Sequence, residues 1–199
     1  MKYQITYMVL LLAFNIFHAL AQPTEANEVF WDADQSLNWE DFKGTPEVTS
    51  NFSAVSATYI ETTHGCSENG SFAYQVRAAF VKDQSWTRDV HSQDLLEHEQ
   101  LHFDLTEYFA RKMRHELGEL VSPCDKPLEK IKIKIDSLYA QMEHAHQLYD
   151  IYTQHGLDHQ QQGEWEDYIA KKLKKLNKYQ DATAITPPRK VEFDNLNTF

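Results

Sequence analysis

The chain has 199 residues, of which 30 are Asp or Glu and 19 are Lys or Arg, so its formal net charge is −11 at pH 7. This acidity argues against nucleic acid and against anionic membrane surfaces as partners, because both bind to basic faces. Hydrophobic residues make up 42% of the chain, and the length is sufficient for one domain with its own core.

The N-terminus has the pattern of a secretory signal peptide over residues 1–21. Lys2 precedes an apolar run at residues 8–14, and Ala19 and Ala21 supply the small side chains typical of a cleavage site. The run is too short to span a membrane. We therefore expect a secreted or periplasmic protein that is not inserted in a membrane once this peptide is removed.

Two β-strands are expected after the N-terminal part of the chain. Residues 52–63 are rich in Val, Thr and Tyr, and residues 71–82 place an apolar side chain at every second position. Residues 64–70 contain the Gly, Asn and Ser that favour a turn. The sequence therefore predicts an antiparallel hairpin at about residues 52–82.

The chain has two cysteines, Cys66 in the predicted hairpin loop and Cys124 after the first long helix. In an oxidising compartment such a pair favours one disulfide over two buried free thiols. Neither cysteine has a second cysteine at metal-ligand spacing, so a cysteine metal site is not expected.

Three helices are predicted from the spacing of apolar residues, at residues 87–118, 128–154 and 163–177. Gly118 and Gly156 stand where the first two are expected to end, because glycine adopts the left-handed conformation that closes many helices.

The order of these elements indicates an α+β fold. A small antiparallel β-sheet would pack against long α-helices that follow it in the chain. We expect a single domain over residues 22–178, followed by a loosely ordered C-terminal tail at residues 179–199.

Residues 98–102 read H-E-x-x-H within the first predicted helix. A helix places residues i and i+4 on one face, so the imidazoles of His98 and His102 can bind one metal ion. Glu99 can then reach a water on that ion, and this set suffices for zinc-assisted hydrolysis. The alternative is a pair of surface histidines. No Pro or Gly interrupts residues 87–117, which keeps the motif in mid-helix and favours a Zn²⁺ site.

A catalytic zinc takes three protein ligands, so a third must come from outside this helix. His155 is the first choice, because imidazole suits zinc and the adjacent Gly156 allows a sharp turn. Asp150 is the second choice, and it could instead accept the other ring N–H of a ligand histidine. His159 is the third choice.

Other polar side chains near the end of the second helix have two interpretations. Tyr149 or Tyr152 could donate a hydrogen bond to an oxyanion, although each is more often a core residue on a helix face. His144 and His146 are expected on the helix surface.

Four blocks of sequence occur in a fixed order, at residues 37–44, 85–86, 96–104 and 149–156. With these blocks the chain resembles, from about residue 31 to 169, the bacterial secreted proteins grouped as domain of unknown function 922, which are regarded as zinc-dependent proteases. The resemblance implies a zincin-like fold, with His98 and His102 as ligands, Glu99 as acid and base, and His155 in a later block.

These expectations describe a secreted zinc-dependent metallopeptidase that acts on peptide or protein substrates. Glu99 would take a proton from the attacking water, and the strand at residues 71–82 would hold the extended substrate. Two alternatives remain open: a secreted binding module without catalytic activity that keeps the fold, and a zinc amidase acting on cell-wall peptides.

Overall fold

The computed structural model describes residues 26–68, 70–120, 124 and 128–186. The expected signal peptide therefore lies outside the described residues. The described residues contain six strands, three long helices and two complete short 3₁₀ helices. In chain order they are β1 (Glu28–Phe30), η1 (Trp39–Asp41), β2 (Ala54–Val55), β3 (Thr58–Cys66), β4 (Phe72–Val81), β5 (Trp86–Thr87), α1 (Gln93–Gly118), α2 (Leu128–Thr153), α3 (His159–Lys175), η3 (Asn177–Tyr179) and β6 (Thr183–Thr186).

The main sheet is antiparallel and has β4 as its central strand. Strand β4 pairs with β3 along one edge and with β1 and β6 along the other. A separate two-stranded sheet joins β2 to β5. The α+β class is confirmed, and β3 and β4 form the predicted hairpin.

Strand β4 shows why the sheet packs as it does. Alternate residues face the same side of a strand, and the apolar ones in β4 are all buried: Phe72, Tyr74, Val76, Ala78 and Phe80. The ring of Phe80 packs against that of Phe103 on α1, with 5.9 Å between centroids. Burial of this face therefore holds α1 against the sheet.

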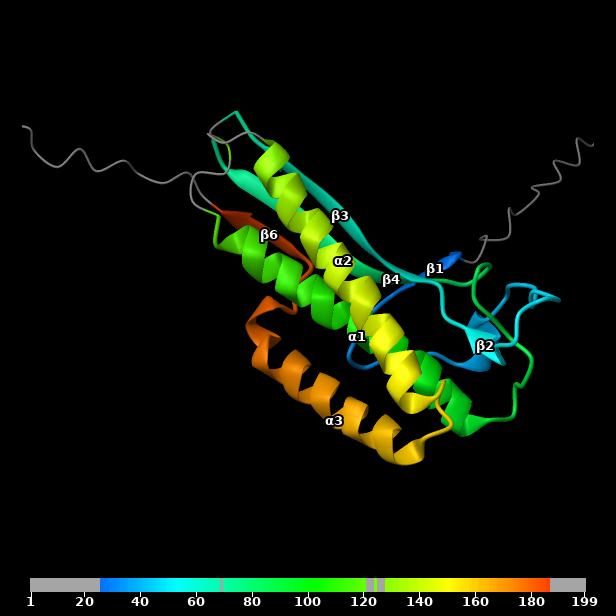
Figure 1. Cartoon of the computed structure of the whole chain (residues 1–199). Helices are drawn as coiled ribbons and strands as arrows, with labels where there is room; N and C mark the ends of the chain where they lie inside the picture. Colours follow the sequence, from blue (N-terminus) through cyan, green and yellow to red (C-terminus); the bar gives the residue numbers. More distant parts are fainter. Residues whose placement is uncertain (1–25, 69, 121–123, 125–127, 187–199) are drawn as a thin grey trace, which may run out of the picture.

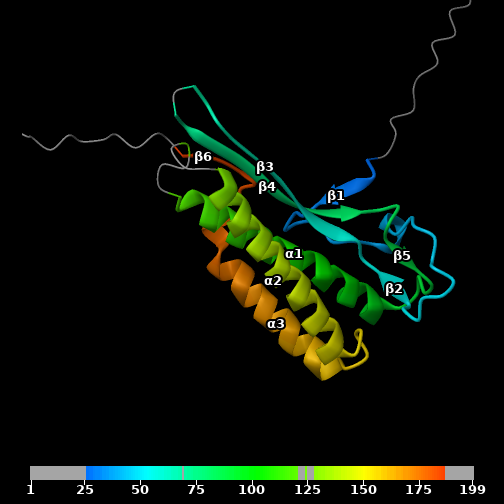
Figure 2. The same ribbon diagram turned by 45° about the horizontal axis from the view of Figure 1, so that its top comes forward.

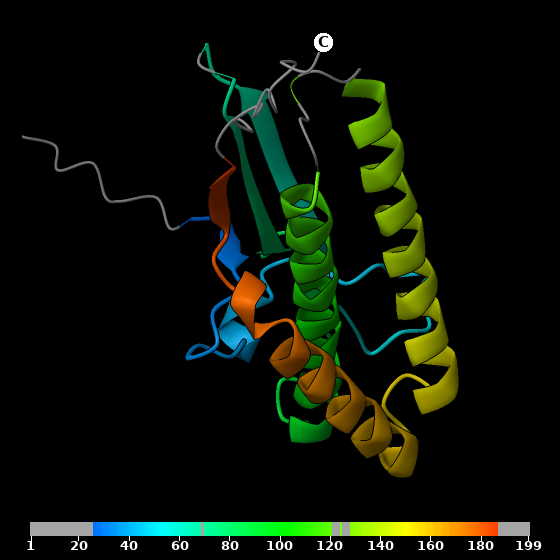
Figure 3. The same cartoon turned by 90° about the vertical axis from the view of Figure 1, so that its left-hand side faces the viewer.

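Helix α1 runs through the middle of the molecule. It contacts β3 and β4, and it also contacts α2 and α3 (Figures 1 and 2). The view in Figure 3 shows α1 between the sheet and α2. Because α1 is covered on most sides, it buries polar as well as apolar residues. The H-E-x-x-H motif lies on this helix.

The boundaries of the helices differ from the predicted ones at two places. Helix α1 begins at Gln93, because the side chain of Ser92 caps it by accepting a hydrogen bond from the Leu95 amide, 3.1 Å. Helix α3 begins at His159, where Asp158 acts in the same way. Helix α2 ends at Thr153, within one residue of the prediction.

The ordered fold continues beyond the expected boundary at residue 178. Strand β6 pairs with β4, and the Arg114 guanidinium donates to the carbonyl oxygens of Tyr179 and Gln180, at 2.9 and 3.3 Å. Arg114 also pairs with buried Glu107, 2.9 Å away. A buried ion pair on α1 therefore fixes the first part of what was expected to be a loose tail.

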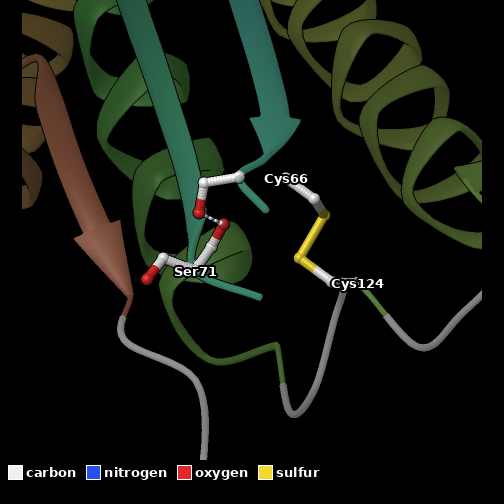
Figure 4. Close-up of a disulfide and its surroundings, with 4 residues drawn as sticks. Cys66, Ser71 and Cys124 are labelled. Atoms are coloured by element: carbon white, nitrogen blue, oxygen red, sulfur yellow. Dashed lines mark hydrogen bonds between the residues drawn. A yellow bond between two sulfur atoms is a disulfide. The ribbon is translucent and has the colours of Figure 1, made fainter. Parts of the chain in front are cut away.

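The predicted disulfide between Cys66 and Cys124 is present, with a Cα–Cα distance of 5.8 Å. It ties the end of β3 to the connector between α1 and α2 (Figure 4). Among the described residues, no helix combines the length and the apolar character needed to cross a bilayer.

Candidate metal centre

A pocket of about 620 Å³ opens over the N-terminal half of α1. Helix α1 contributes His98, Glu99 and His102 to its lining. The end of α2 and the loop after it form one wall, and the segment at residues 51–58, which includes β2, forms another.

Side chains from two helices and a loop meet at one carboxylate oxygen in this pocket. Asp150 Oδ1 lies 3.2 Å from His98 Nε2 and 3.0 Å from His102 Nε2. It also lies 3.4 Å from His155 Nδ1. The ligand atoms of His98, Asp150 and His155 are all within 4.8 Å of one another. The structure thus brings together all four residues that were considered as principal ligands.

The backbone after α2 places His155 at this point. Gln154, His155 and Gly156 all have positive φ, at 51°, 57° and 82°, which turns the chain back toward α1. The His155 amide donates to the Asp150 carbonyl oxygen, 2.9 Å. A Cβ on Gly156 would stand 3.0 Å from the Cβ of His98, so only glycine lets the loop pack this closely. The predicted role of Gly156 is confirmed.

The ring nitrogen of His98 that faces away from the pocket has a hydrogen-bond partner. His98 Nδ1 lies 3.3 Å from Gln162 Oε1. The Gln162 amide group donates from Nε2 to Glu166, 2.9 Å, which orients its oxygen toward His98. His98 therefore donates from Nδ1 to Gln162, and its Nε2 faces Asp150.

His102 is supported from behind by a residue that the sequence analysis did not select. His102 Nδ1 lies 2.9 Å from His146 Nδ1. His144 is exposed as expected, but His146 turns inward and is half-buried. Its spacing of four residues from Asp150 on α2 was the available signal, because i and i+4 share a helix face.

Asp150 and His102 shift the pKa of one another in this pocket. Burial alone would raise the pKa of Asp150, but hydrogen bonds with His102 and His98 outweigh it and the pKa is lowered. Burial lowers the pKa of His102, but its hydrogen bond to Asp150 and the charge of Glu99 raise it overall. A carboxylate oxygen and a bare imidazole nitrogen repel one another unless a proton or a metal ion lies between them.

The donor set fits zinc in chemistry and in spacing. Imidazole and carboxylate are both common zinc ligands, and atoms that each bind zinc tetrahedrally at about 2.0–2.1 Å lie about 3.3 Å apart. The distances from Asp150 Oδ1 to His98 and His102 are close to this value. Each motif histidine therefore lies at a distance from Asp150 that suits a shared ion, and His155 joins His98 and Asp150 in a set whose ligand atoms are all within 4.8 Å of one another.

Glu99 is the one buried side chain among the described residues that leaves a polar atom without a partner. It is 3% exposed, and its Oε2 accepts no hydrogen bond from the part of the chain that the structure describes. Such an atom in a native fold usually faces a water, an ion or a substrate. Glu99 also lines the pocket, so its carboxylate is available to a bound molecule.

Three residues considered from the sequence lie away from the pocket lining. Tyr149 is fully buried and donates its hydroxyl to Gln162, 2.8 Å. Tyr152 is exposed on α2. The side chain of His159 is 73% exposed and lies 3.9 Å from Asp94. Tyr149 is therefore a core residue, which was the preferred interpretation, and Tyr152 and His159 lie on the surface outside the pocket lining.

Comparison with known proteins links this region to a family without a known activity. Residues 73–156 match a family described as "Bacterial protein of unknown function (DUF922)". The match covers α1 and α2, and it includes His98, Glu99, His102, Asp150 and His155. No curated protein and no solved structure matches the chain.

Proposed function

We propose that the protein is a secreted zinc-dependent peptidase of the zincin-like type. The observation that carries the proposal is the meeting of His98 Nε2, His102 Nε2 and Asp150 Oδ1 beside a buried Glu99 with a partnerless oxygen. An H-E-x-x-H pair on a helix that packs on an antiparallel sheet supports the same function.

In this proposal His98, His102 and Asp150 hold the ion. Both imidazoles turn Nε2 toward Asp150, and their Nδ1 atoms are occupied by Gln162 and His146. Asp150 therefore lies on the ligand side of both rings, whereas a carboxylate that merely supports a ligand would contact Nδ1. This geometry favours Asp150 over His155 as the third ligand.

A zinc ion held by these residues would supply Lewis-acid chemistry, lowering the pKa of a bound water and polarising the scissile carbonyl group. Glu99 accepts a proton from the attacking water at its free Oε2 and delivers it to the leaving amine. His155 lines the pocket and is half-exposed, so its imidazole can donate to the oxygen that gains negative charge.

The segment at residues 51–58 is the best place for an extended substrate. Strand β4, the expected choice, is paired on both edges and has no free edge. Ser53 accepts a hydrogen bond from the Arg88 amide, 2.8 Å, and pairing in an antiparallel ladder alternates. Ala54 and Ser56 therefore direct their backbone groups away from β5, and both line the pocket, where a peptide can add as a further strand.

The disulfide supports the secreted location. Disulfides form and persist in oxidising compartments and are rare in the cytosol, and Cys66 and Cys124 are bonded here.

Zinc content and hydrolysis of a mixed peptide library by Glu99→Gln protein test the proposal. The variant should keep about one zinc per chain and lose hydrolysis by about 10²–10⁴-fold, because only proton transfer is removed. Glu97→Gln, an exposed change on the same helix, should behave as wild type. A wild-type protein that binds no zinc, or full hydrolysis by Glu99→Gln, would contradict the proposal.

A further inference from the structure

The Nδ1 atoms of His98 and His102, which face away from the pocket, contact chemically different partners. The partner of His98 is an amide oxygen of Gln162, which can only accept a hydrogen bond. The partner of His102 is the Nδ1 of His146, 2.9 Å away, and an imidazole nitrogen can either donate or accept. A hydrogen bond between these two nitrogens needs one hydrogen, which is carried by one of the two rings. If His102 carries it on Nδ1, its Nε2 can offer a lone pair to the pocket.

The surroundings of His146 indicate where that hydrogen is. His146 Nε2 lies 3.3 Å from the hydroxyl oxygen of Thr106. The Thr106 hydroxyl donates to the carbonyl oxygen of His102 one helical turn earlier, 3.0 Å. Its oxygen therefore accepts from His146 Nε2–H, and the Thr58 hydroxyl, at 2.8 Å, can donate to it as well.

A neutral imidazole has one N–H, so a hydrogen on Nε2 of His146 leaves its Nδ1 bare. That Nδ1 then accepts the hydrogen of His102 Nδ1. The Nε2 of His102 is then the nitrogen that faces the pocket, 3.0 Å from Asp150 Oδ1, where a proton or a metal ion can lie between the two atoms.

We propose that His146 is a positioning residue for the metal centre, which accepts the Nδ1 hydrogen of His102 and so directs the Nε2 lone pair of His102 into the pocket. The consequence for zinc rests on the proposed function, whereas the position of the hydrogen does not. His146 would then act through His102, and the two ring planes are inclined by only 23°, which suits a hydrogen bond that lies close to both planes.

Zinc affinity of two nearly isosteric variants separates hydrogen bonding from packing. His146→Leu removes the acceptor and should weaken zinc binding about 10–100-fold, the usual loss for a supporting partner of a ligand histidine. His146→Asn keeps an acceptor oxygen near the position of Nδ1 and should remain within a few-fold of wild type. His144→Leu, an exposed change on the same helix, should leave affinity unchanged. Chelator competition measures all four proteins without an activity assay.

Wild-type affinity in His146→Leu, or an equal loss in the Leu and Asn variants, would overturn the proposal. A second measurement does not depend on zinc or on the folding of any variant. Nitrogen NMR of the metal-free wild-type protein should find His146 with a hydrogen on Nε2 and none on Nδ1. The reverse pattern would overturn the proposal. If the wild type bound no zinc, the peptidase function would fail, and NMR would still decide the role of His146.

Discussion

One oxygen atom of Asp150 is the point at which three imidazoles of the pocket meet. Two of them come from α1 and one from the loop after α2, so the charge of Asp150 links these two segments to α2. His155 is the most exposed of the three, at 51% of its side chain, against 3% for His98 and 12% for His102. We therefore expect a substitution of Asp150 to act mainly on zinc affinity and a substitution of His155 to act mainly on turnover.

Asp150→Asn should lower zinc affinity by more than about 100-fold, which exceeds the usual effect of a supporting residue, because it removes a charged ligand. His155→Gln should keep most of the zinc affinity and lower turnover about 10²–10³-fold, as expected for loss of an oxyanion donor. Chelator competition and peptide hydrolysis measure the two effects. Asp167→Asn, on the exposed face of α3, is the control. A larger loss of zinc in His155→Gln would make His155 the third ligand.

The pKa of His146 gives a pH dependence of stability. Burial, followed by the nearby His102, lowers this pKa to about 3. The unfolded chain therefore binds a proton near pH 6.5 that the folded chain does not bind, and the free energy of unfolding falls as pH drops through this window. One proton contributes at most about 1.4 kcal/mol per pH unit.

Urea unfolding of the metal-free protein between about pH 6.5 and about pH 4.5 measures this contribution. His146→Asn cannot titrate, so it should lose less stability over this range than wild type. His144→Asn, which changes an exposed histidine, should keep the wild-type dependence. Parallel curves for wild type and His146→Asn would contradict the expected shift.

At the scale of elements, the left-handed turn after α2 connects the stability of the fold to the proposed metal site. Gly156 has φ +82°, and an added Cβ would lie 3.0 and 3.1 Å from Cβ and Cγ of His98. The clash is with the base of the ligand side chain, which has little room to move inside α1. The turn and the ligand therefore have to move together.

Gly156→Ala should destabilise the fold by about 1–3 kcal/mol through backbone strain, and it should weaken zinc binding by displacing His98. Gly163→Ala is a matched control within α3, where no atom lies within 4 Å of the added Cβ. That change should stabilise the helix by about 0.5–1 kcal/mol. Thermal unfolding and zinc titration test both, and unchanged zinc affinity in Gly156→Ala would show that His98 is not displaced.

Local patterns explain which elements could be predicted from the sequence. The alternation in β4 and the helical spacing around His98 and His102 are properties of neighbouring residues, so they were visible directly. Strand β2 was merged into a longer strand, because it has two residues and exists through pairing with β5. Strand β6 was missed for the same reason, since its partner β4 is about 110 residues earlier in the chain.

The candidate site likewise contains residues that could be predicted from local patterns and residues that could not. The motif residues are set by spacing along one helix, but the support for them comes from other helices. Gln162 reaches His98 across 64 residues, and His146 reaches His102 across 44. Such contacts depend on how α1, α2 and α3 pack, which no local pattern contains. The sequence could therefore propose the ligands and could not identify what orients them.

At the scale of the whole molecule, the disulfide and the pocket lie at opposite ends of α2. Cys124 precedes the helix and Asp150 lies near its C-terminus. A helical rise of about 1.5 Å per residue separates them by about 30 Å. The bond closes a loop with a sequence separation of 58 residues, so its main effect is on the unfolded chain.

The double variant Cys66→Ser with Cys124→Ser should lose about 4 kcal/mol of unfolding free energy, as the loop-entropy relation gives for this loop length. Zinc affinity should stay at the wild-type value, because the pocket does not depend on this end of the molecule. Denaturant unfolding and chelator competition measure the two quantities. A parallel loss of zinc binding would show that the two ends are coupled.

The position of this disulfide also makes it a suitable site for chemical attachment. Mild reduction would free one thiol at the end of β3 and one in the connector before α2, at the end of α2 remote from the pocket. A dye or a surface tether attached there would leave that opening accessible to large polypeptides. Immobilised protein could then be screened against intact candidate targets in flow, with the same attachment chemistry for wild type and variants.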